Sequence, residues 1–311
     1  MADCEKQIWE LVRRIEPTLT QRLGAVRSHK HLRNLLCTGQ MAARIQKSYL
    51  SGSYARKTAI YPLDDVDIIF MIDPSYWPKP FNLLLGSSTY PAPAAVLESF
   101  AKAIRYRYPI SSVHGQRRSV RLQLYHLDID IVPAIQDRKD EKRIRIPDKR
   151  AGEWILSSPL RHSENATAVN KFQCGKFKPL VKLLKYWNGN LPGTAAFRSF
   201  AIETMAVRVF QNFKFDSLQE GLRAFFDFVA FASGNRTMLS WSDKRGITLN
   251  WWSCGVPDAA GTGGNIVADI DDERRKRFVE NAMRSRNKME ESFNAASVET
   301  ACRRVSEALK M

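Results

Sequence analysis

Four aspartates stand in two short apolar runs, at a spacing that suits metal chemistry. Asp65 and Asp67 open the run DVDIIFMI, and Asp128 and Asp130 lie in LDIDIVPA. On an extended strand, residues two apart point to the same face with Cα atoms about 6.6–6.8 Å apart, so each pair projects its carboxylates together. Because strands disfavour aspartate and like charges repel, carboxylates inside apolar strands indicate a bound cation.

The expected cation is Mg²⁺, with Mn²⁺ as the alternative, because carboxylates are hard oxygen ligands. Two such ions about 3.5–4 Å apart activate an attacking hydroxyl and stabilise a leaving pyrophosphate. A site of this kind needs a third carboxylate beside Asp65 and Asp67. The second acidic run supplies it if its strand lies beside the first, through either Asp128 or Asp130.

A turn of small residues precedes the first acidic pair. Gly52 allows close approach of the chain, so the backbone N–H groups around Gly52 and Ser53 can face an anion. Asp65 follows Ser53 after twelve residues, and the second acidic run ends in Val-Pro-Ala. An isolated Asp-x-Asp also fits a solvent-facing strand, but the combination predicts an anion-binding turn beside a metal site.

The predicted secondary structure that must position these residues changes near residue 150, from a mixture of helices and strands to mainly helices. Before it, the patterns predict both helices and strands: helices over 5–24 (interrupted at Pro17), 31–50 and 94–106, and strands over 66–72, 119–125 and 127–132, the last ended by Pro133. After it, helical periodicity dominates, over 177–188, 197–213, 218–232 and 272–295. The fold class is therefore α+β, with a catalytic core over 1–155 and a helical C-terminal lobe over 156–311.

Composition limits the function classes. The 311 residues carry 48 Lys+Arg against 32 Asp+Glu, a net charge of +16, and are 44% hydrophobic. The apolar content excludes wholesale disorder, and the charge suggests an anionic partner. No uninterrupted apolar run approaches about 18 residues, and the five cysteines are dispersed without a CxxC pair. We therefore expect a cytoplasmic protein with no membrane partner and no structural zinc. We also expect a monomer.

Together, GSYARKT, DDVDIIF and DIDIVPA resemble the nucleotidyltransferase superfamily with the polymerase-β-like fold. Within it, the chain resembles the cGAS/DncV-like nucleotidyltransferases (CD-NTases) and the related oligoadenylate synthases. The resemblance implies that Asp65 and Asp67 bind both metal ions and that Asp130 is the third ligand. Asp64 and Asp128 remain the second choices.

The same resemblance implies a nucleotide-binding set in both halves of the chain. Gly52 and Ser53 would hold an NTP triphosphate, as would the lysines of LVKLLKYW and the serine of FRSFAIE, whose following aromatic would stack on a base. These further positions are Lys182, Lys185 (the first choice of the two lysines), Ser199 and Phe200. Arg56 would add positive charge. The alternatives are solvated lysines, a core position for Phe200 and a surface position for Arg56.

The resemblance further implies a polymerase-β-like core, a mixed sheet with flanking helices, and an active site in the cleft between core and helical lobe. The implied reaction joins NTPs, ATP among them, into a cyclic di- or trinucleotide of bacterial antiphage signalling (CBASS). No zinc-binding insertion like that of the animal DNA sensor is present, which favours the bacterial type.

Two other functions stay open. One is an RNA-tailing or template-independent nucleotidyltransferase of the same fold, and the other is a non-catalytic nucleic-acid-binding module. Positive residues beyond the needs of mononucleotides suggest a nucleic-acid activator, and a protein activator is the alternative. This surplus includes Arg105, Arg107, Arg117, Arg118, Arg121 and the run 138–150.

Overall fold

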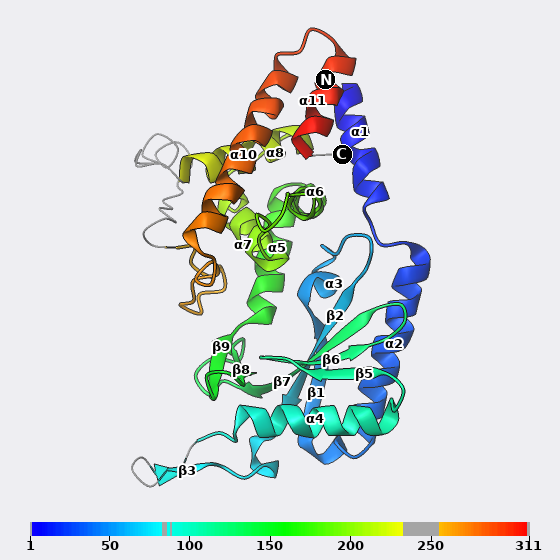
Figure 1. Cartoon of the computed structure of the whole chain (residues 1–311), viewed down its shortest axis with the longest axis vertical. Coiled ribbons are helices and arrows are strands. Elements are labelled where there is room, and N and C mark those ends of the chain that lie inside the picture. The colour runs from blue at the N-terminus through cyan, green and yellow to red at the C-terminus, as the bar shows by residue number, and fades with distance from the viewer. Residues whose placement is uncertain (1, 83–85, 88, 233–254, 310–311) are drawn as a thin grey trace. The chain divides into compact units, whose positions relative to one another are not determined.

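A seven-stranded mixed sheet forms the centre of the first half of the chain (Figure 1). The computed structural model describes residues 2–82, 86–87, 89–232 and 255–309. The sheet has the order β1-β2-β7-β6-β5, and β8 pairs with both β7 and β9. The strands are β1 (Ile45–Ser51), β2 (Asp65–Ile72), β5 (Ser112–Gly115), β6 (Val120–Gln123), β7 (Asp128–Gln136), β8 (Ile144–Asp148) and β9 (Glu153–Ser157). A separate small hairpin pairs β3 (Phe81–Asn82) with β4 (Gly86–Ser87).

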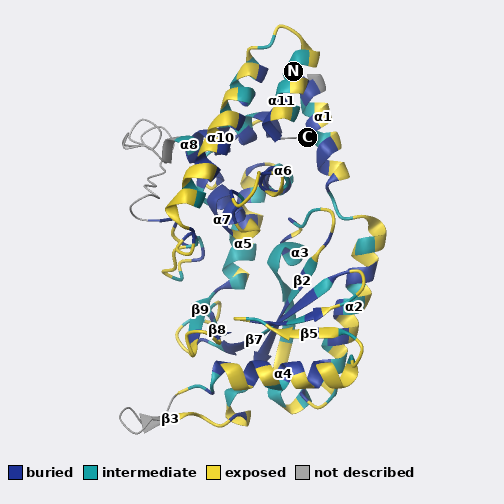
Figure 2. Ribbon diagram, in the orientation of Figure 1, coloured by how far each residue is buried: buried dark blue, intermediate teal, exposed yellow. Residues whose placement is uncertain are grey.

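Strands β2 and β7 are largely buried (Figure 2), and the two faces of the sheet bury different apolar clusters. Alternate residues of β2, such as Ile68 and Phe70, enter the main core with helices α2 (Leu19–Thr38) and α4 (Pro93–Arg107). Ile69 and Met71 point the other way into a smaller apolar cluster. Because side chains alternate along a strand, Asp65 and Asp67 share the face of Ile69 and Met71, opposite α2 and α4.

The helix expected over 31–50 is wrong in its second half. Helix α2 ends at Thr38, followed by Gly39 and a short 3₁₀ turn, η1 (Ala42–Arg44), and the chain then forms β1. β1 pairs antiparallel with β2, with Leu50 opposite Ile68. The apolar residues of this stretch fit a helical period, but the hydrogen bonds offered by β2 decide the outcome.

β7 continues past Pro133 to Gln136. The sequence analysis predicted that this strand ends at Pro133, which is wrong. Pairing with β6 ends at Ile131, and pairing with β8 begins at Ile135. Pro133 thus has a partner strand on one side only, where it pairs with Phe70 of β2. The missing N–H therefore interrupts no ladder on the open side, which is where proline is tolerated in a sheet.

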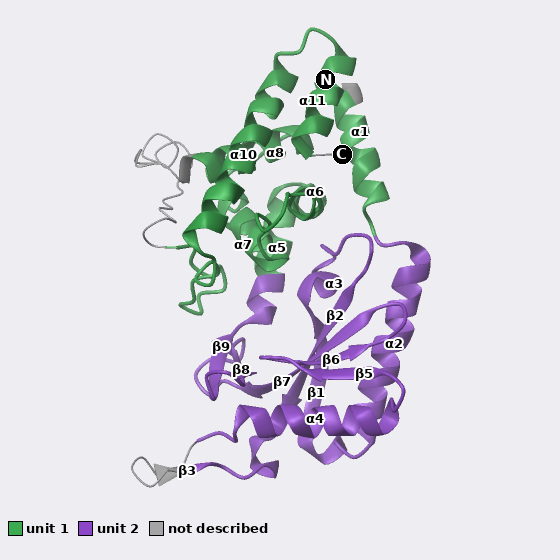
Figure 3. Cartoon of the chain, viewed as in Figure 1, with its two compact units in different colours: residues 1–16, 164–311 green, residues 17–163 purple. Residues whose placement is uncertain are grey.

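The chain forms two compact units, which we call the sheet unit (residues 17–163) and the helical unit (residues 1–16 and 164–311) (Figure 3). The helical unit contains most of α5, whose first residues belong to the sheet unit. Its helices are α1 (Ala2–Arg14), α5 (Pro159–Phe172), α6 (Phe177–Gly189), α7 (Ser199–Phe210), α8 (Leu218–Ala232), α10 (Asp272–Phe293) and α11 (Val298–Leu309). None of the helices described is long and apolar enough to cross a membrane.

Helix α1 groups with the helical unit, whereas the expected division placed it with the catalytic core. The carboxylate of Glu5 accepts hydrogen bonds from the backbone N–H groups of Leu218 (2.9 Å) and Gln219 (3.3 Å) at the start of α8. Helix α1 also packs against α11, where Cys4 lies beside Cys302. These contacts join the start of the chain to its last helices.

Candidate active site

The two acidic runs lie on adjacent strands in matching register. β2 and β7 pair in parallel, with Asp67 opposite Asp130 and Asp65 opposite Asp128. Neighbouring strands are about 4.8 Å apart, and all four residues occupy the face opposite α2 and α4. The structure therefore brings Asp65, Asp67 and Asp130 to one region of the sheet unit.

Asp67 carries the strongest electrostatic signal in this group. Burial foremost, together with the negative charges of Asp65 and Asp130, raises its pKa from 3.8 to about 7. Arg56 and Arg121 oppose this shift only in part. A cation bound among these carboxylates would relieve the repulsion, which is the electrostatic condition expected of a metal site.

Gly52 explains how the small-residue turn meets the acids. It opens a short helix, α3 (Gly52–Arg56), with φ of +67°, and Ser53 is the next residue. A Cβ atom at position 52 would lie 1.7 Å from Asp67 Oδ2. Only glycine fits here, because the Asp67 carboxylate rests against its Cα and the backbone is left-handed.

Arg121 on β6 is a site residue that the sequence analysis placed in the charge surplus. Its Nε and Nη2 donate to the two carboxylate oxygens of Asp130 at 3.0 and 2.7 Å, and its Nη1 lies 3.3 Å from Asp128 Oδ2. These carboxylates raise the pKa of the guanidinium further above its ordinary value. The sequence signal that could have found Arg121 is its place between the apolar Val120 and Leu122. Because side chains alternate along a strand, Arg121 points away from the apolar core and toward the face that carries the aspartates.

The carboxylate oxygens of the candidate site are ligands of the kind that a divalent cation prefers. Asp65, Asp67 and Asp130 offer hard oxygen ligands from neighbouring strands, and the raised pKa of Asp67 reflects its burial and the negative charges of Asp65 and Asp130 beside it. Among the residues described, no three acidic, histidine or cysteine side chains are arranged closely enough to hold an ion. In this structure Arg121 engages both oxygens of Asp130, so metal binding requires the carboxylates to reorient.

The burial of Arg56 and Phe200 decides against the alternatives left open for them, a surface position for Arg56 and a core position for Phe200. Arg56 is buried and acts electrostatically on Asp67, so the surface alternative is wrong. Phe200, the second residue of α7, is 41% exposed, so it is not a core residue. Ser199, at the first position of the same helix, is also exposed.

The two lysines of α6 are buried and paired, so they are not ordinary solvated lysines. Lys182 Nζ donates to Glu16, two residues after the end of α1, and Lys185 Nζ lies 3.0 Å from Glu203 Oε2 on α7. The predicted nucleotide-binding set is thus divided between the units. Gly52, Ser53 and Arg56 belong to the sheet unit, whereas Lys182, Lys185, Ser199 and Phe200 belong to the helical unit.

Several arginines of the charge surplus form ion pairs. Arg117 and Arg118 bind Asp148, at 2.7 and 3.3 Å, and Arg105 binds Glu98 at 2.8 Å. Hydrogen bonds from Arg117 foremost hold the pKa of Asp148 at about 2. These contacts give Arg117 and Arg118 a structural use at the turn between β8 and β9.

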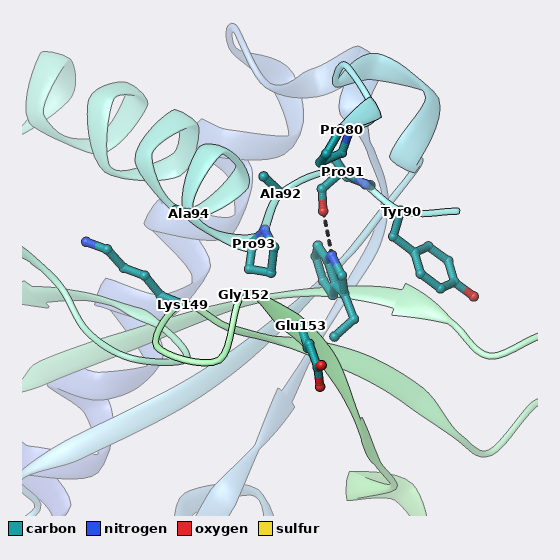
Figure 4. Close-up of a pocket in the computed structure, with 10 residues that line it drawn as sticks. Pro80, Tyr90, Pro91, Ala92, Pro93, Ala94, Lys149, Gly152 and Glu153 are labelled. Atoms are coloured by element: carbon teal, nitrogen blue, oxygen red, sulfur yellow. Dashed lines mark hydrogen bonds between the residues drawn. The ribbon is translucent and has the colours of Figure 1, made fainter. Parts of the chain in front are cut away.

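A pocket of about 380 Å³ lies at that turn and next to the start of α4 (Figure 4). Proline and aromatic side chains line much of it, and Trp154 Nε1 donates a 2.7 Å hydrogen bond to the Pro91 carbonyl. Lys149 and Glu153 add one charge of each sign. None of the aspartates or turn residues of the candidate site lines this pocket.

Residues 3–170 match the family model described as the Second Messenger Oligonucleotide or Dinucleotide Synthetase (SMODS) domain. The match contains the glycine turn, both acidic strands and Arg121. The chain belongs to the SMODS family. This membership agrees with the CD-NTase resemblance of the acidic motifs.

Curated relatives of this SMODS protein are named as cyclic nucleotide synthases. A cyclic AMP-AMP-AMP synthase from an Acinetobacter strain is 31% identical over 214 residues, covering 66% of this chain and 58% of the relative. A second, from Escherichia coli MS 115-1, is 27% identical over 188 residues, covering 58% of this chain and 55% of the relative. The matched part of the chain thus spans little more than half the length of these relatives.

Solved structures confirm the fold over nearly the whole chain. The E. coli MS115-1 CdnC structure with ATP aligns with a TM-score of 0.73 at 19% identity, covering 99% of this chain and 97% of CdnC. CdnG of Bradyrhizobium diazoefficiens in complex with GTP aligns with a TM-score of 0.68 at 15% identity, covering 98% and 97%. The SMODS protein therefore has the CD-NTase form of the polymerase-β-like fold.

Proposed function

We propose that this protein is a metal-dependent nucleotidyltransferase that joins NTPs into a cyclic di- or trinucleotide. The observation that carries the proposal is the register of β2 and β7, which sets Asp67 beside Asp130, with Gly52 against the Asp67 carboxylate. A protein that only binds nucleic acid gains nothing from carboxylates that repel phosphate. The curated relatives named as cyclic nucleotide synthases support the same reaction class.

Asp65, Asp67 and Asp130 would hold two Mg²⁺ ions, which supply charge neutralisation for the triphosphate and acidify the attacking hydroxyl when bound. Gly52 and Ser53 present backbone N–H groups to the phosphates of the donor NTP.

The remaining groups of the set position the donor nucleotide. Lys185, Lys182, Ser199 and Arg56 bind its phosphates, and the exposed ring of Phe200 stacks on a base. Positioning and charge neutralisation supply most of the rate enhancement in this class of reaction.

The reaction forms one bond and breaks one. A ribose hydroxyl of the acceptor nucleotide attacks the α-phosphorus of the donor, and the bond from this phosphorus to the bridging oxygen of pyrophosphate breaks. The hydroxyl proton passes to a carboxylate, for which Asp130 is the candidate. A final attack within the linear product closes the ring and releases another pyrophosphate.

We propose ATP as one of the substrates, in line with the ATP complex of CdnC and the names of the curated relatives. A CdnC structure in complex with a HORMA protein supports a protein activator for this chain, and a nucleic-acid activator is the alternative. The biological role that follows is production of a second messenger in antiphage defence, by a monomeric enzyme in the cytoplasm.

The test is product analysis after incubation with all four NTPs and Mg²⁺, or Mn²⁺ in a parallel sample. Small products that resist phosphatase and have the mass of cyclic oligonucleotides are expected. A ladder of extended RNA in the presence of an RNA primer would instead support the tailing enzyme. Nucleic-acid binding that weakens steeply with salt, with no NTP turnover, would support the binding module.

A further inference from the structure

Helices α6 and α7 are joined by a buried ion pair that the sequence analysis did not assign. Lys185 Nζ lies 3.0 Å from Glu203 Oε2, and the two side chains are only 3% and 5% exposed. A buried charge is costly unless an opposite charge compensates it, so each member of this pair depends on the other. The carboxylate therefore fixes where the ammonium group lies.

The position of Glu203 on α7 indicates where the Lys185 ammonium lies relative to Ser199. Ser199 opens α7, and Glu203 follows four residues later, so both occupy one face of the helix. An ammonium held by Glu203 thus lies along the face that carries Ser199. The N-cap residue, Arg198, makes no side-chain cap bond, and the positive end of the helix dipole adds to the attraction for an anion there.

Lys182, one turn earlier on α6, has a different environment. Its partner Glu16 lies just after α1 rather than on α7, and the Glu16 side chain is 37% exposed. That contact is accessible to water and has no link to Ser199. The two lysines of the motif are therefore not equivalent, and only Lys185 is held by a buried carboxylate on the helix that carries Ser199.

We propose that Glu203 is a positioning residue for NTP binding, holding the Lys185 ammonium where it meets the triphosphate beside Ser199. The inference rests on the proposed function, since it assigns Lys185 to the donor phosphates. An ammonium has three donors, so it can donate to more than one oxygen acceptor. Prior ordering of the long lysine side chain also removes an entropy cost from binding.

The test is the affinity for an ATP analogue whose α,β-bridging oxygen is replaced by methylene, measured by calorimetry with Mg²⁺. Lys185→Gln and Glu203→Gln should each weaken binding roughly tenfold, the size expected for one charge-assisted hydrogen bond. The double variant should bind no more weakly than Lys185→Gln alone, because Glu203 acts only through Lys185. In turnover assays, Glu203→Gln should raise KM more than it lowers kcat.

Asp227→Asn is the matched control. Asp227 is a buried carboxylate of α8 in the same helical unit, and it accepts a 2.6 Å hydrogen bond from Arg286. Its loss should lower thermal stability about as much as the loss of Glu203, with unchanged nucleotide affinity. A weakening of binding as large in Asp227→Asn as in Glu203→Gln would show a general structural effect and overturn the proposal.

The remaining outcomes separate the proposal from the function on which it rests. Wild-type affinity in Glu203→Gln, or additive losses in the double variant, would overturn the role of Glu203 while leaving NTP binding intact. A wild-type protein that neither binds the analogue nor converts NTPs would instead contradict the proposed function. If Glu203→Gln does not fold, Glu203→Asp keeps the charge on a shorter side chain. Its affinity should then be intermediate, and wild-type affinity in this variant would overturn the role of Glu203.

Discussion

At the scale of single residues, the close contact between Gly52 and the Asp67 carboxylate makes a sharp prediction. Gly52→Ala places a Cβ atom 1.7 Å from Asp67 Oδ2, so the carboxylate must move. We expect activity to fall roughly 100-fold, since misplacement of about 1 Å has that cost. Product formation per unit of folded protein is the measurement.

Gly152→Ala is the control for backbone strain. Gly152 has φ of +72°, but a Cβ atom there would meet nothing within 4 Å. Both variants should lose roughly 1–2 kcal/mol of stability from the left-handed backbone. Gly152→Ala should keep its activity, and an equal loss of activity in the two variants would show that strain rather than the Asp67 contact is responsible.

The raised pKa of Asp67 predicts an unusual pH dependence of stability in the metal-free protein. Between pH 3.8 and about 7 the folded protein retains a proton on Asp67 that the unfolded chain has lost. This group's contribution therefore falls as pH rises through that window, by roughly 3–5 kcal/mol. Urea unfolding in EDTA at a series of pH values, compared with Asp67→Asn, measures it. Identical pH profiles for the two proteins would contradict the assignment.

Arg121 should stabilise the acidic group until a metal ion replaces its charge. Arg121→Met leaves Asp130 and Asp128 without their guanidinium, and we expect a loss of about 3 kcal/mol in EDTA. Mn²⁺ should then stabilise this variant more than the wild type, which thermal unfolding measures. Arg145→Met is the matched control, because Arg145 pairs with Asp137 at 3.1 Å in the same unit. Equal Mn²⁺ responses in all three proteins would contradict the metal assignment.

Sequence reasoning found the carboxylates but missed their arginine. The acids stood out because aspartate is unusual inside apolar strands, and spacing alone placed each pair on one face. Arg121 did not stand out, because the chain has many basic residues. The sequence of one strand also does not show which residue of the neighbouring strand lies beside a given position. Its register opposite Asp130 is a property of strand pairing.

At the scale of elements, β2 was predicted well, β7 was predicted with too early an end, and the strand beside β2 was not predicted. β2 is a continuous branched apolar run, which needs no partner to be recognised. β1 begins with Ile45-Gln-Lys-Ser-Tyr-Leu, whose polar residues also fit an amphipathic helix. Its pairing with β2, some twenty residues later, decides between the two structures and is not encoded locally.

The link between α1 and α8 yields a prediction about these two elements. Glu5 accepts from two backbone N–H groups at the start of α8, which acts as a cap from another helix. Glu5→Ala should cost about 1 kcal/mol and speed hydrogen exchange at Leu218 and Gln219. Glu5→Gln, which keeps one acceptor oxygen, should lose less. Unchanged exchange at these two amides in Glu5→Ala would contradict the cap.

At the scale of the whole molecule, the sequence predicted an α/β part followed by a helical part, and the family match and solved structures confirm that fold. It did not predict that the first helix groups with the last ones, because the contacts of Glu5 with α8 join residues more than 200 positions apart. Arg117, Arg118 and Arg121 all bind aspartates, so these three arginines have a structural use in the fold. Such pairs leave the net charge of +16 unchanged.

The most direct test of the central claim is pyrophosphate release from ATP and the other NTPs by wild type and by Asp65→Asn/Asp67→Asn. Asp73→Asn, just beyond the end of β2, serves as the control, because asparagine can still accept the Ser75 N–H. We predict that the wild type and Asp73→Asn release pyrophosphate and form the same cyclic product. The double variant should remain folded and lose at least 1000-fold in rate, roughly the effect of removing charge stabilisation of the transition state. Undiminished pyrophosphate release by the folded double variant would contradict the account.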